Sequence, residues 1–474
     1  LFKCTSCGSL KSLLGLHTWY MVALHDSYIN VMEICVWVFC MVTLCHAADI
    51  SYMNTTIRDH FSSIRHHETN PTNKEMARAF IYEEFHRFGL HTEFHNFTTT
   101  DNTKGSKKGS NIIGILKGKR FGTFKDRIAG IGAHYDTVRN SPGVDDNGSG
   151  LVAMLEVAKR ARALDRHNTA IFVSFDLEEE DYKGSRQFVE EWLPQFLVTN
   201  YSADPSSYAD QIKLHGFYVL DSIMNYNTSS HSQTFPPSLT VDKVRTVFSK
   251  FYNDLVADNF QGDYINSIYR KDEDKFLDKA LSQAWQSLSD PVYQMENLQI
   301  PISDLNRISE SDFREFLRSD HANFWGKSIP ALLLTDSGNY RGDMINCYHQ
   351  PCDNMHVMLT DDNLKFLGKQ ADALYLSLHF LEETDCGAPP NIVNTVYTLT
   401  DDSQFTIYEC TEDTVLFPSK SNQTIACLTS GEWSEVPFIC INSTFVSGMD
   451  SLHAGRGCPC FLVLMITMLL AMLV

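Results

Sequence analysis

The stretch "IAGIGAHYDTVRNSPGVDDNGSG", residues 128–150, decides the fold. Its first six residues are small or apolar, as in a buried β-strand, and His134 follows them directly. A glycine-rich turn carrying Asp145 and Asp146 comes next, and a run with helical spacing of apolar residues begins at Gly150. The stretch therefore predicts a strand–turn–helix unit with polar residues between strand and helix.

Similar apolar runs recur along the chain and predict further buried strands. Helical patterns such as "GLVAMLEVAKRARAL" lie between them. This alternation predicts an α/β fold, a three-layer sandwich with a mixed, largely parallel central sheet. The runs are "NIIGIL" (111–116), "AIFVSF" (170–175), "GFYVL" (216–220) and "IPALLL" (329–334).

One helix has predicted start and stop signals. Thr72 and Glu75 form a potential capping box before an apolar pattern of helical spacing, and Gly89 is expected to end the helix. Residues 230–318 are mostly polar and helical in pattern. We interpret them as an insertion or cap, and the sequence does not indicate what they do.

Residues of metal-binding type follow three of the predicted strands. His134 and Asp136 follow the first, the run 178–180 of three glutamates follows the second, and Asp221 follows the third. Taken singly, such residues are more often satisfied polar groups, solvated charges or turn formers. In open α/β sheets, however, ligands bind at the carboxyl ends of strands, so their joint placement favours a site.

A further histidine lies in "YHQPCDN", residues 348–354, and Cys347 precedes this stretch. Cys347 and Cys352 are near enough in the sequence to form a disulfide around His349. The simpler interpretation is a stapled surface turn. The alternative is that the disulfide holds His349 rigidly as a metal ligand, which the strand-end residues favour.

These segments together resemble peptidase family M28, a family of zinc peptidases. The resemblance is strongest to secreted bacterial and fungal aminopeptidases and related animal ectoenzymes, and it covers most of residues 70–380. It implies a zinc-exopeptidase type of α/β fold. The motifs are "HYD" (134–136), "PGVDDNGSG" (142–150), Glu178-Glu179 followed by Gly184-Ser185, "LDS" (220–222), "SDHANFW" (319–325) and "CYHQPCD" (347–353).

The resemblance implies two zinc ions in one site. His134 and Asp221 would bind one ion, Glu179 and His349 would bind the other, and Asp146 would bridge the pair. Imidazoles and carboxylates are ordinary zinc ligands, and three protein ligands per ion leave room for a shared water.

The resemblance also implies roles for residues beside these ligands. Glu178 would be the general base, and Tyr348 would stabilise the oxyanion. Asp136 would orient His134. Asp181 stands where relatives commonly have glycine, which leaves the substrate preference open.

Six of the thirteen cysteines lie in the predicted mature body, as expected in an oxidising compartment. Residues 384–442 resemble a sushi (complement control protein) module, a small disulfide-stapled all-β unit, through the opening "CGAPP" and "GEW" before the last cysteine. The resemblance implies the pairs Cys386–Cys427 and Cys410–Cys440.

The two ends of the chain predict export and membrane attachment. Residues 32–48 resemble a signal peptide, with a buried helix as the alternative, and residues 1–31 are interpreted as a non-biological leader. The apolar residues 458–474 follow a polar spacer, 443–457, and resemble a GPI-attachment signal, with a short transmembrane anchor as the alternative. Sequons occur at Asn54, Asn96, Asn200, Asn227, Asn422 and Asn442, and Asn147, in the predicted site, is expected to be bare.

The formal net charge of −19 argues against nucleic acid as a partner. Residues 49–383 are expected to be a secreted or cell-surface di-zinc exopeptidase domain, an aminopeptidase acting on peptides. A C-terminal anchor would hold it at the outer membrane surface, and the sushi module would offer a site for a protein partner.

Three alternatives remain open. The first is a carboxypeptidase or dipeptidase with the same metal site, in which Arg318 and "SDH" (319–321) contribute to terminus recognition. The second is a glutaminyl cyclase-like acyltransferase, which needs only one zinc. The third is a catalytically inactive receptor or adhesion ectodomain.

Overall fold

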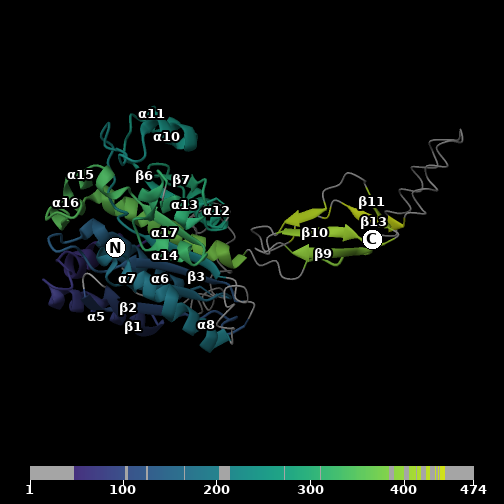
Figure 1. Cartoon of the computed structure of the whole chain (residues 1–474), viewed down its shortest axis with the longest axis horizontal. Helices are drawn as coiled ribbons and strands as arrows, with labels where there is room; N and C mark the ends of the chain where they lie inside the picture. The colour runs from purple at the N-terminus through teal and green to yellow at the C-terminus, as the bar shows by residue number, and fades with distance from the viewer. Residues whose placement is uncertain are drawn as a thin grey trace, which may run out of the picture. The chain divides into compact units, whose positions relative to one another are not determined.

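The computed structural model describes residues 47–442 and divides into two compact units, one ending at His379 and the other beginning at Phe380 (Figure 1). Within this range it leaves out 102–104, 124, 125, 165, 202–213, 272, 310, 384–388, 400–404, 413, 418–422, 427–432, 434, 435 and 437. The predicted leader, almost all of the signal peptide, the spacer and the apolar tail therefore lie outside the described residues. Among the residues that are described, no helix is both long and apolar enough to cross a bilayer.

The first unit is built on one eight-stranded mixed sheet. Its central strands β4, β3, β5 and β8 run parallel, whereas β1, β2 and β6 join by antiparallel pairing and β7 lies parallel to β6. In sheet order the strands are β1 (His91–Asp101), β2 (Gly105–Leu116), β4 (Ala170–Phe175), β3 (Ile128–His134), β5 (Leu214–Leu220), β8 (Ala331–Thr335), β6 (Tyr264–Arg270) and β7 (Gln294–Ile300).

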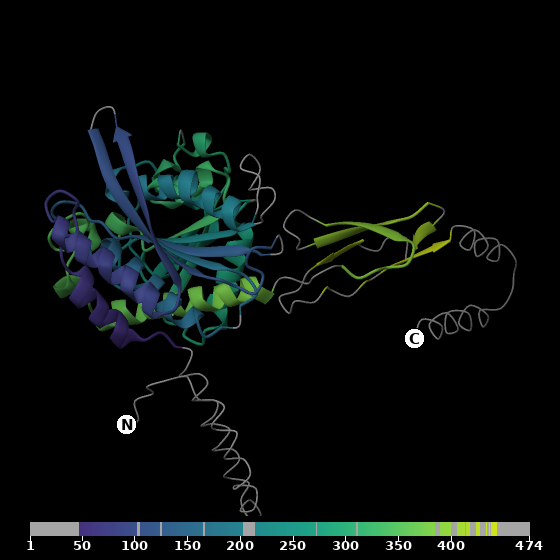
Figure 2. The same ribbon diagram turned by 90° about the horizontal axis from the view of Figure 1, so that it is seen from below.

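Both faces of the central strands are buried, which explains their continuous apolar runs. Phe217 and Tyr218 are neighbours in β5 and so point to opposite faces. The ring of Phe217 lies 4.7 Å from Phe324 of α14 (His321–Gly326), and the Tyr218 hydroxyl hydrogen-bonds Ser377 of α17 (Asp361–Glu383). Figure 2 shows helices on both sides of the strands, so the predicted three layers are present.

The remaining large helices divide between the same two faces. On the side of α17, Phe85 of one helix contacts Phe172 of β4 at 6.3 Å between ring centroids. On the side of α14, Phe188 contacts Phe217 at 5.7 Å. The elements are α5 (Pro71–Arg87) and α6 (Gly150–Ala161) on the first side, and α7 (Lys183–Gln187), η5 (Phe188–Trp192) and α8 (Leu193–Tyr201) on the second.

The prediction that residues 230–318 are mostly helical is wrong in part. This region contains helices, but it also contains β6 and β7, which extend the sheet. Both strands carry buried polar residues, such as Asn266 and Glu296, so neither shows the apolar run that marked the other strands. The helices are α10 (Val241–Val247), α11 (Ser249–Ala257), α12 (Lys275–Ser287) and α13 (Leu305–Ser309).

The capping box predicted at Thr72 is also wrong. Helix α5 begins at Pro71, and its N-cap is Asn70, so Thr72 lies inside the first turn. Proline favours the first helical position because its fixed φ is helical and its missing N–H would have no partner there. The predicted stop is confirmed, since Gly89 follows the helix with a φ of 81°.

Apart from the last residues of α17, which ends at Glu383, the described part of the second unit is all β. Its strands form a three-stranded sheet, β12-β10-β9, and a two-stranded sheet, β11-β13. Tyr408, Ile425 and Phe438 form its small core, and the disulfide predicted between Cys410 and Cys440 is present. Cys386 and Cys427 lie outside the described residues. The strands are β9 (Thr395–Leu399), β10 (Phe405–Cys410), β11 (Thr414–Phe417), β12 (Thr424–Ala426) and β13 (Ile439–Asn442).

Candidate metal centre

The carboxyl ends of three adjacent parallel strands create the site. His134 is the last residue of β3, and Asp221 directly follows β5. Glu178 and Glu179 begin the short 3-10 helix η4 (Glu178–Glu180), which two residues separate from the end of β4. Because β3 lies between β4 and β5, these side chains reach the same edge of the sheet.

The first potential ligand group surrounds His134. Its Nε2 lies 3.3 Å from Oδ1 of Asp146 and 3.7 Å from Oδ1 of Asp221. The imidazole is 1% exposed, yet its Nε2 has no hydrogen-bond partner. Buried polar atoms normally have partners, so this nitrogen is a candidate ligand for a cation.

The second group surrounds His349. Its Nε2 lies 3.2 Å from Oδ2 of Asp146 and 3.3 Å from Oε2 of Glu179, and it too has no hydrogen-bond partner. The two oxygens of Asp146 thus face the two histidines separately. All five residues that the family resemblance implied as ligands are gathered in two triads that share Asp146.

Asp136 supports this arrangement from behind. Its carboxylate accepts hydrogen bonds from the backbone N–H groups of Glu178 and Glu179, at 3.1 and 3.3 Å. Its backbone oxygen lies 3.2 Å from Nδ1 of His134. If Nδ1 carries the proton and donates it there, Nε2 is left as a free lone pair for a cation. In that tautomer the carbonyl of Asp136 orients His134, and its carboxylate holds the glutamate turn.

Sequence reasoning missed two buried residues that hold the Asp146 segment. Asp353 accepts hydrogen bonds from the backbone nitrogens of Asp145 and Asp146, at 2.8 and 3.2 Å. Arg65 donates to the backbone carbonyl oxygens of Pro142 and Gly143, which directly precede this segment. In the sequence, Asp353 was indicated only as the last residue of the motif "CYHQPCD". No motif included Arg65.

Asp145 is turned away from the histidines. Its Oδ1 accepts a hydrogen bond from the backbone nitrogen of Met224 at 3.0 Å, and its side chain is fully buried. Of the two consecutive aspartates, Asp146 is therefore the one that faces the potential ligands.

Burial and neighbouring charged groups shift the pKa values of the carboxyl groups in the site. Burial, together with neighbouring acidic groups, raises the pKa of Glu178 and that of Glu179 well above the usual range. Burial also opposes ionisation of Asp146, but its contacts with His134 and His349 outweigh this and lower its pKa. Positive charge placed among these groups would offset their mutual repulsion.

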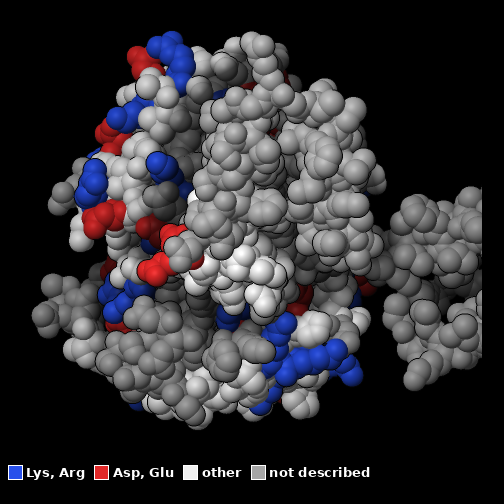
Figure 3. All heavy atoms as spheres, turned by 90° about the vertical axis from the view of Figure 1, so that its right-hand side faces the viewer, with Lys and Arg blue, Asp and Glu red and all other residues white. Residues whose placement is uncertain are grey.

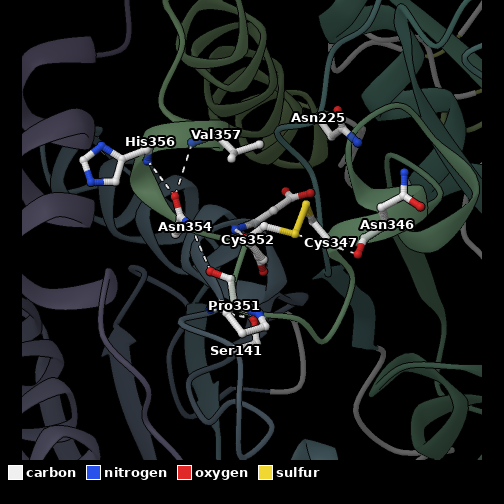
Figure 4. Close-up of a disulfide and its surroundings, with 12 residues drawn as sticks. Ser141, Asn225, Asn346, Cys347, Pro351, Cys352, Asn354, His356 and Val357 are labelled. Carbon is white, nitrogen blue, oxygen red and sulfur yellow. Dashed lines mark hydrogen bonds between the residues drawn. A yellow bond between two sulfur atoms is a disulfide. The ribbon is translucent and has the colours of Figure 1, made fainter.

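The predicted disulfide between Cys347 and Cys352 is present, with its Cα atoms 5.0 Å apart (Figure 4). It closes the turn that carries His349, whose φ of 60° is uncommon for a residue other than glycine. Asn354 fixes the far side of the turn, because it donates to the Pro351 oxygen and caps the helix α16 (Met355–Met358) (Figure 4).

Removing this disulfide is expected to loosen His349. We expect the Cys347→Ser/Cys352→Ser variant to bind metal about tenfold more weakly, as when residues that support a ligand are lost. Competitive chelator titration checks this. The matched control is Cys410→Ser/Cys440→Ser, which removes the disulfide of the other unit and should leave metal affinity unchanged. Equal affinity of the first variant and the intact chain would contradict a positioning role.

An apolar pocket opens beside the centre. Asp221 and Tyr348 line it on the side of the site, and its space, including the open mouth, is about 820 Å³. Residues of the region 230–318 form most of the walls of this pocket. Lining the pocket is a role that the sequence did not indicate for this region. The main apolar lining residues are Phe235, Leu239, Phe248, Phe251, Ile268 and Phe316.

A third group of potential ligands, His66, His67 and Glu180, has a different character. Lys107 Nζ lies 3.0 Å from His67 Nε2 and 2.6 Å from a Glu180 oxygen. Nδ1 of His66 accepts two backbone N–H groups. The lysine ammonium already provides the positive charge, so we interpret this group as a structural ion-pair cluster.

The family model of peptidase family M28 matches residues 111–371, more than half of the chain. The chain belongs to peptidase family M28.

Individual relatives match over shorter or more divergent stretches. Aminopeptidase YwaD of Bacillus subtilis is 38% identical over 85 residues, 18% of each chain. The uncharacterized protein YfbL of Escherichia coli is 26% identical over 232 residues, 47% of this chain and 58% of the relative. Among solved structures, BSAP, a zinc aminopeptidase from Bacillus subtilis, is 12% identical with a TM-score of 0.49, over 73% of this chain and 97% of that one.

Proposed function

We propose that this chain is a di-zinc exopeptidase, an aminopeptidase that removes N-terminal residues from peptides. One observation carries the proposal: two histidines with unpartnered Nε2 atoms face opposite oxygens of one aspartate, each with a further carboxylate beside it. Membership in a peptidase family supports it.

The residues present fit zinc. Each triad offers one imidazole nitrogen and two carboxylate oxygens within 4.8 Å of one another, a usual donor set for zinc in hydrolytic sites. His134, Asp221 and Asp146 would hold one ion, and Glu179, His349 and Asp146 the other. When bound, the ions supply Lewis acidity that polarises a substrate carbonyl and lowers the pKa of a shared water.

Glu178 is placed to move protons beside that centre. Its Oε2 lies 3.9 Å from Nε2 of His134, and the residue is 6% exposed. A buried carboxylate accepts a proton more readily than an exposed one. Glu178 would take a proton from the attacking water and deliver it to the departing amine.

Tyr348 lies between His349 and the apolar pocket. Its ring stacks on that of His349 at 3.9 Å, and it also lines the apolar pocket. Its hydroxyl would donate a hydrogen bond to the carbonyl oxygen of the scissile bond as negative charge develops there. The apolar pocket would take the side chain of the substrate's first residue.

Peptide hydrolysis with and without a free N-terminus tests this function. We expect purified zinc-loaded protein to release the first residue of an unblocked peptide, and to stop when chelated. N-acetylation of the same peptide should abolish cleavage, whereas C-terminal amidation should not. Unchanged cleavage of the acetylated peptide would exclude an aminopeptidase, and zinc analysis should find two ions per chain.

Several features remain proposals on sequence grounds. We propose that residues 384–442 form a sushi module, which the described strands and the disulfide Cys410–Cys440 support. Export, a C-terminal membrane anchor and a protein partner for the module belong to the same proposal. In Figure 3, basic and acidic side chains alternate along the left of the face, and a group of basic side chains gathers at its lower right. The formal net charge of −19 is the argument against a polyanionic partner.

A further inference from the structure

We propose that Arg318 is a positioning residue, which orients the hydroxyl of Tyr348 so that its proton points toward the substrate carbonyl. The proposal rests on the proposed peptidase function. The sequence linked Arg318 only to recognition of a peptide terminus, and this proposal assigns it a different role.

The contact between the two side chains has a defined direction. Nη2 of Arg318 lies 3.4 Å from the hydroxyl oxygen of Tyr348. A guanidinium can only donate, so the tyrosine oxygen must accept in this hydrogen bond. A phenol carries one proton, and that proton is therefore free to donate elsewhere. The charged donor also polarises the O–H bond, which makes the hydroxyl a stronger donor.

Packing places the tyrosine oxygen but does not orient its proton. The ring of Tyr348 stacks on His349 with an interplanar angle of 17°. On another side it lies against Gly338, where an added Cβ would stand 3.5 Å from the ring. These contacts hold the ring, whereas the hydroxyl rotates about its own C–O bond. Only a hydrogen-bond partner can select one direction for the proton.

Arg318 is itself well anchored. It follows the 3-10 helix η6 (Arg314–Leu317), and its Nη1 donates to Oδ1 of Asn339 at 3.1 Å and to the Tyr340 hydroxyl at 3.5 Å. A carboxylate oxygen of Glu315 lies 3.7 Å away. The guanidinium also faces the ring of Tyr348, with Cζ 5.6 Å from its centroid.

These contacts argue against Arg318 as the receptor of a substrate's C-terminal carboxylate. Three of the five guanidinium N–H groups already donate to Asn339, Tyr340 and Tyr348, and Glu315 offsets part of the charge. A carboxylate receptor would need at least two donors directed into the pocket. The geometry fits an internal role, acting through Tyr348.

A double-mutant cycle on the zinc-loaded full-length chain tests the proposal. We expect Tyr348→Phe to lower kcat on the order of 100-fold, as loss of an oxyanion donor does. Arg318→Met should lower kcat about tenfold with little change in KM, since a contact made in the transition state is weakened. In the Tyr348→Phe background, Arg318→Met should change kcat less than about twofold, because its target is gone.

Two further variants separate orientation from general effects. Arg318→Lys can still donate one hydrogen bond and should recover part of the loss. Arg314→Met is the matched control, because Arg314 begins the 3-10 helix that Arg318 follows and also faces Glu315, at 3.9 Å. It should leave kcat and KM unchanged, and thermal unfolding should show that all variants are folded.

A binding measurement provides a readout that does not need turnover. Calorimetry should show that Arg318→Met weakens binding of the phosphonic acid analogue of leucine, which mimics a tetrahedral oxyanion, but not binding of leucinamide. The weakening should disappear in the Tyr348→Phe background. If the unmodified chain is inactive, the proposed function fails, and this binding cycle still decides whether the two residues act together.

Two results would overturn the proposal. Additive losses in the cycle would show that Arg318 acts independently of Tyr348. A rise in KM confined to peptides with a free C-terminal carboxylate, absent for their amides, would show that Arg318 binds that carboxylate.

Discussion

The Glu178→Gln variant is expected to keep its zinc and to lose peptide hydrolysis by about 10³- to 10⁴-fold, the upper range for loss of a general base. Glutamine has nearly the same shape, but it cannot accept the proton of the attacking water. The backbone N–H of Glu178 would still bond to Asp136, so the turn that carries Glu179 should be undisturbed. Both quantities are measured on one preparation: zinc content shows whether the metal is retained, and kcat shows whether hydrolysis is lost.

The neighbouring Glu180 offers a matched control. It belongs to the same run of three glutamates, but its carboxylate pairs with Lys107 at 2.6 Å. Glu180→Gln should therefore leave kcat within about twofold of the unmodified chain, as for most substitutions away from a functional site. Full activity of Glu178→Gln would remove Glu178 as the base, and equal losses in both variants would indicate damage to the turn.

Replacing Asp146 is expected to have the second large effect. Its two carboxylate oxygens face the two histidines, at 3.3 and 3.2 Å, so both triads are incomplete without it. We expect Asp146→Ala to bind less than one zinc per chain and to lose activity by at least about a thousandfold, because several kcal/mol of charge stabilisation depend on the ions. Zinc analysis after gel filtration measures the first effect.

Asp221→Ala provides the informative comparison. Asp221 belongs to one triad only, so this variant should lose one ion and keep the other. Retention of two ions by Asp146→Ala would contradict a shared ligand. Loss of both ions by Asp221→Ala would show instead that the two triads bind metal only together, and thermal unfolding would identify any variant that fails to fold.

The strand-end residues could be identified from sequence because their signals are local. An apolar run followed at once by His134 or Asp221 shows both a buried strand and the side chain at its end. The same local reasoning failed where the local signal was weak or ambiguous. Strands β6 and β7 contain buried polar residues, so they lack an apolar run. Helix α5 begins at Pro71, so Thr72 lies inside its first turn and does not cap it.

The sequence by itself determined the order of the motifs, the central strands and the side chains that end them, because periodicity and burial are encoded over a few residues. Only the tertiary structure decided which groups meet. The backbone N–H of Asp146 donates a hydrogen bond to Asp353, which is 207 residues away in the sequence. Arg318 donates a hydrogen bond to Tyr348, which is 30 residues away. Such proximity depends on strand order and on loops that cross the edge of the sheet, and no local pattern carries that information.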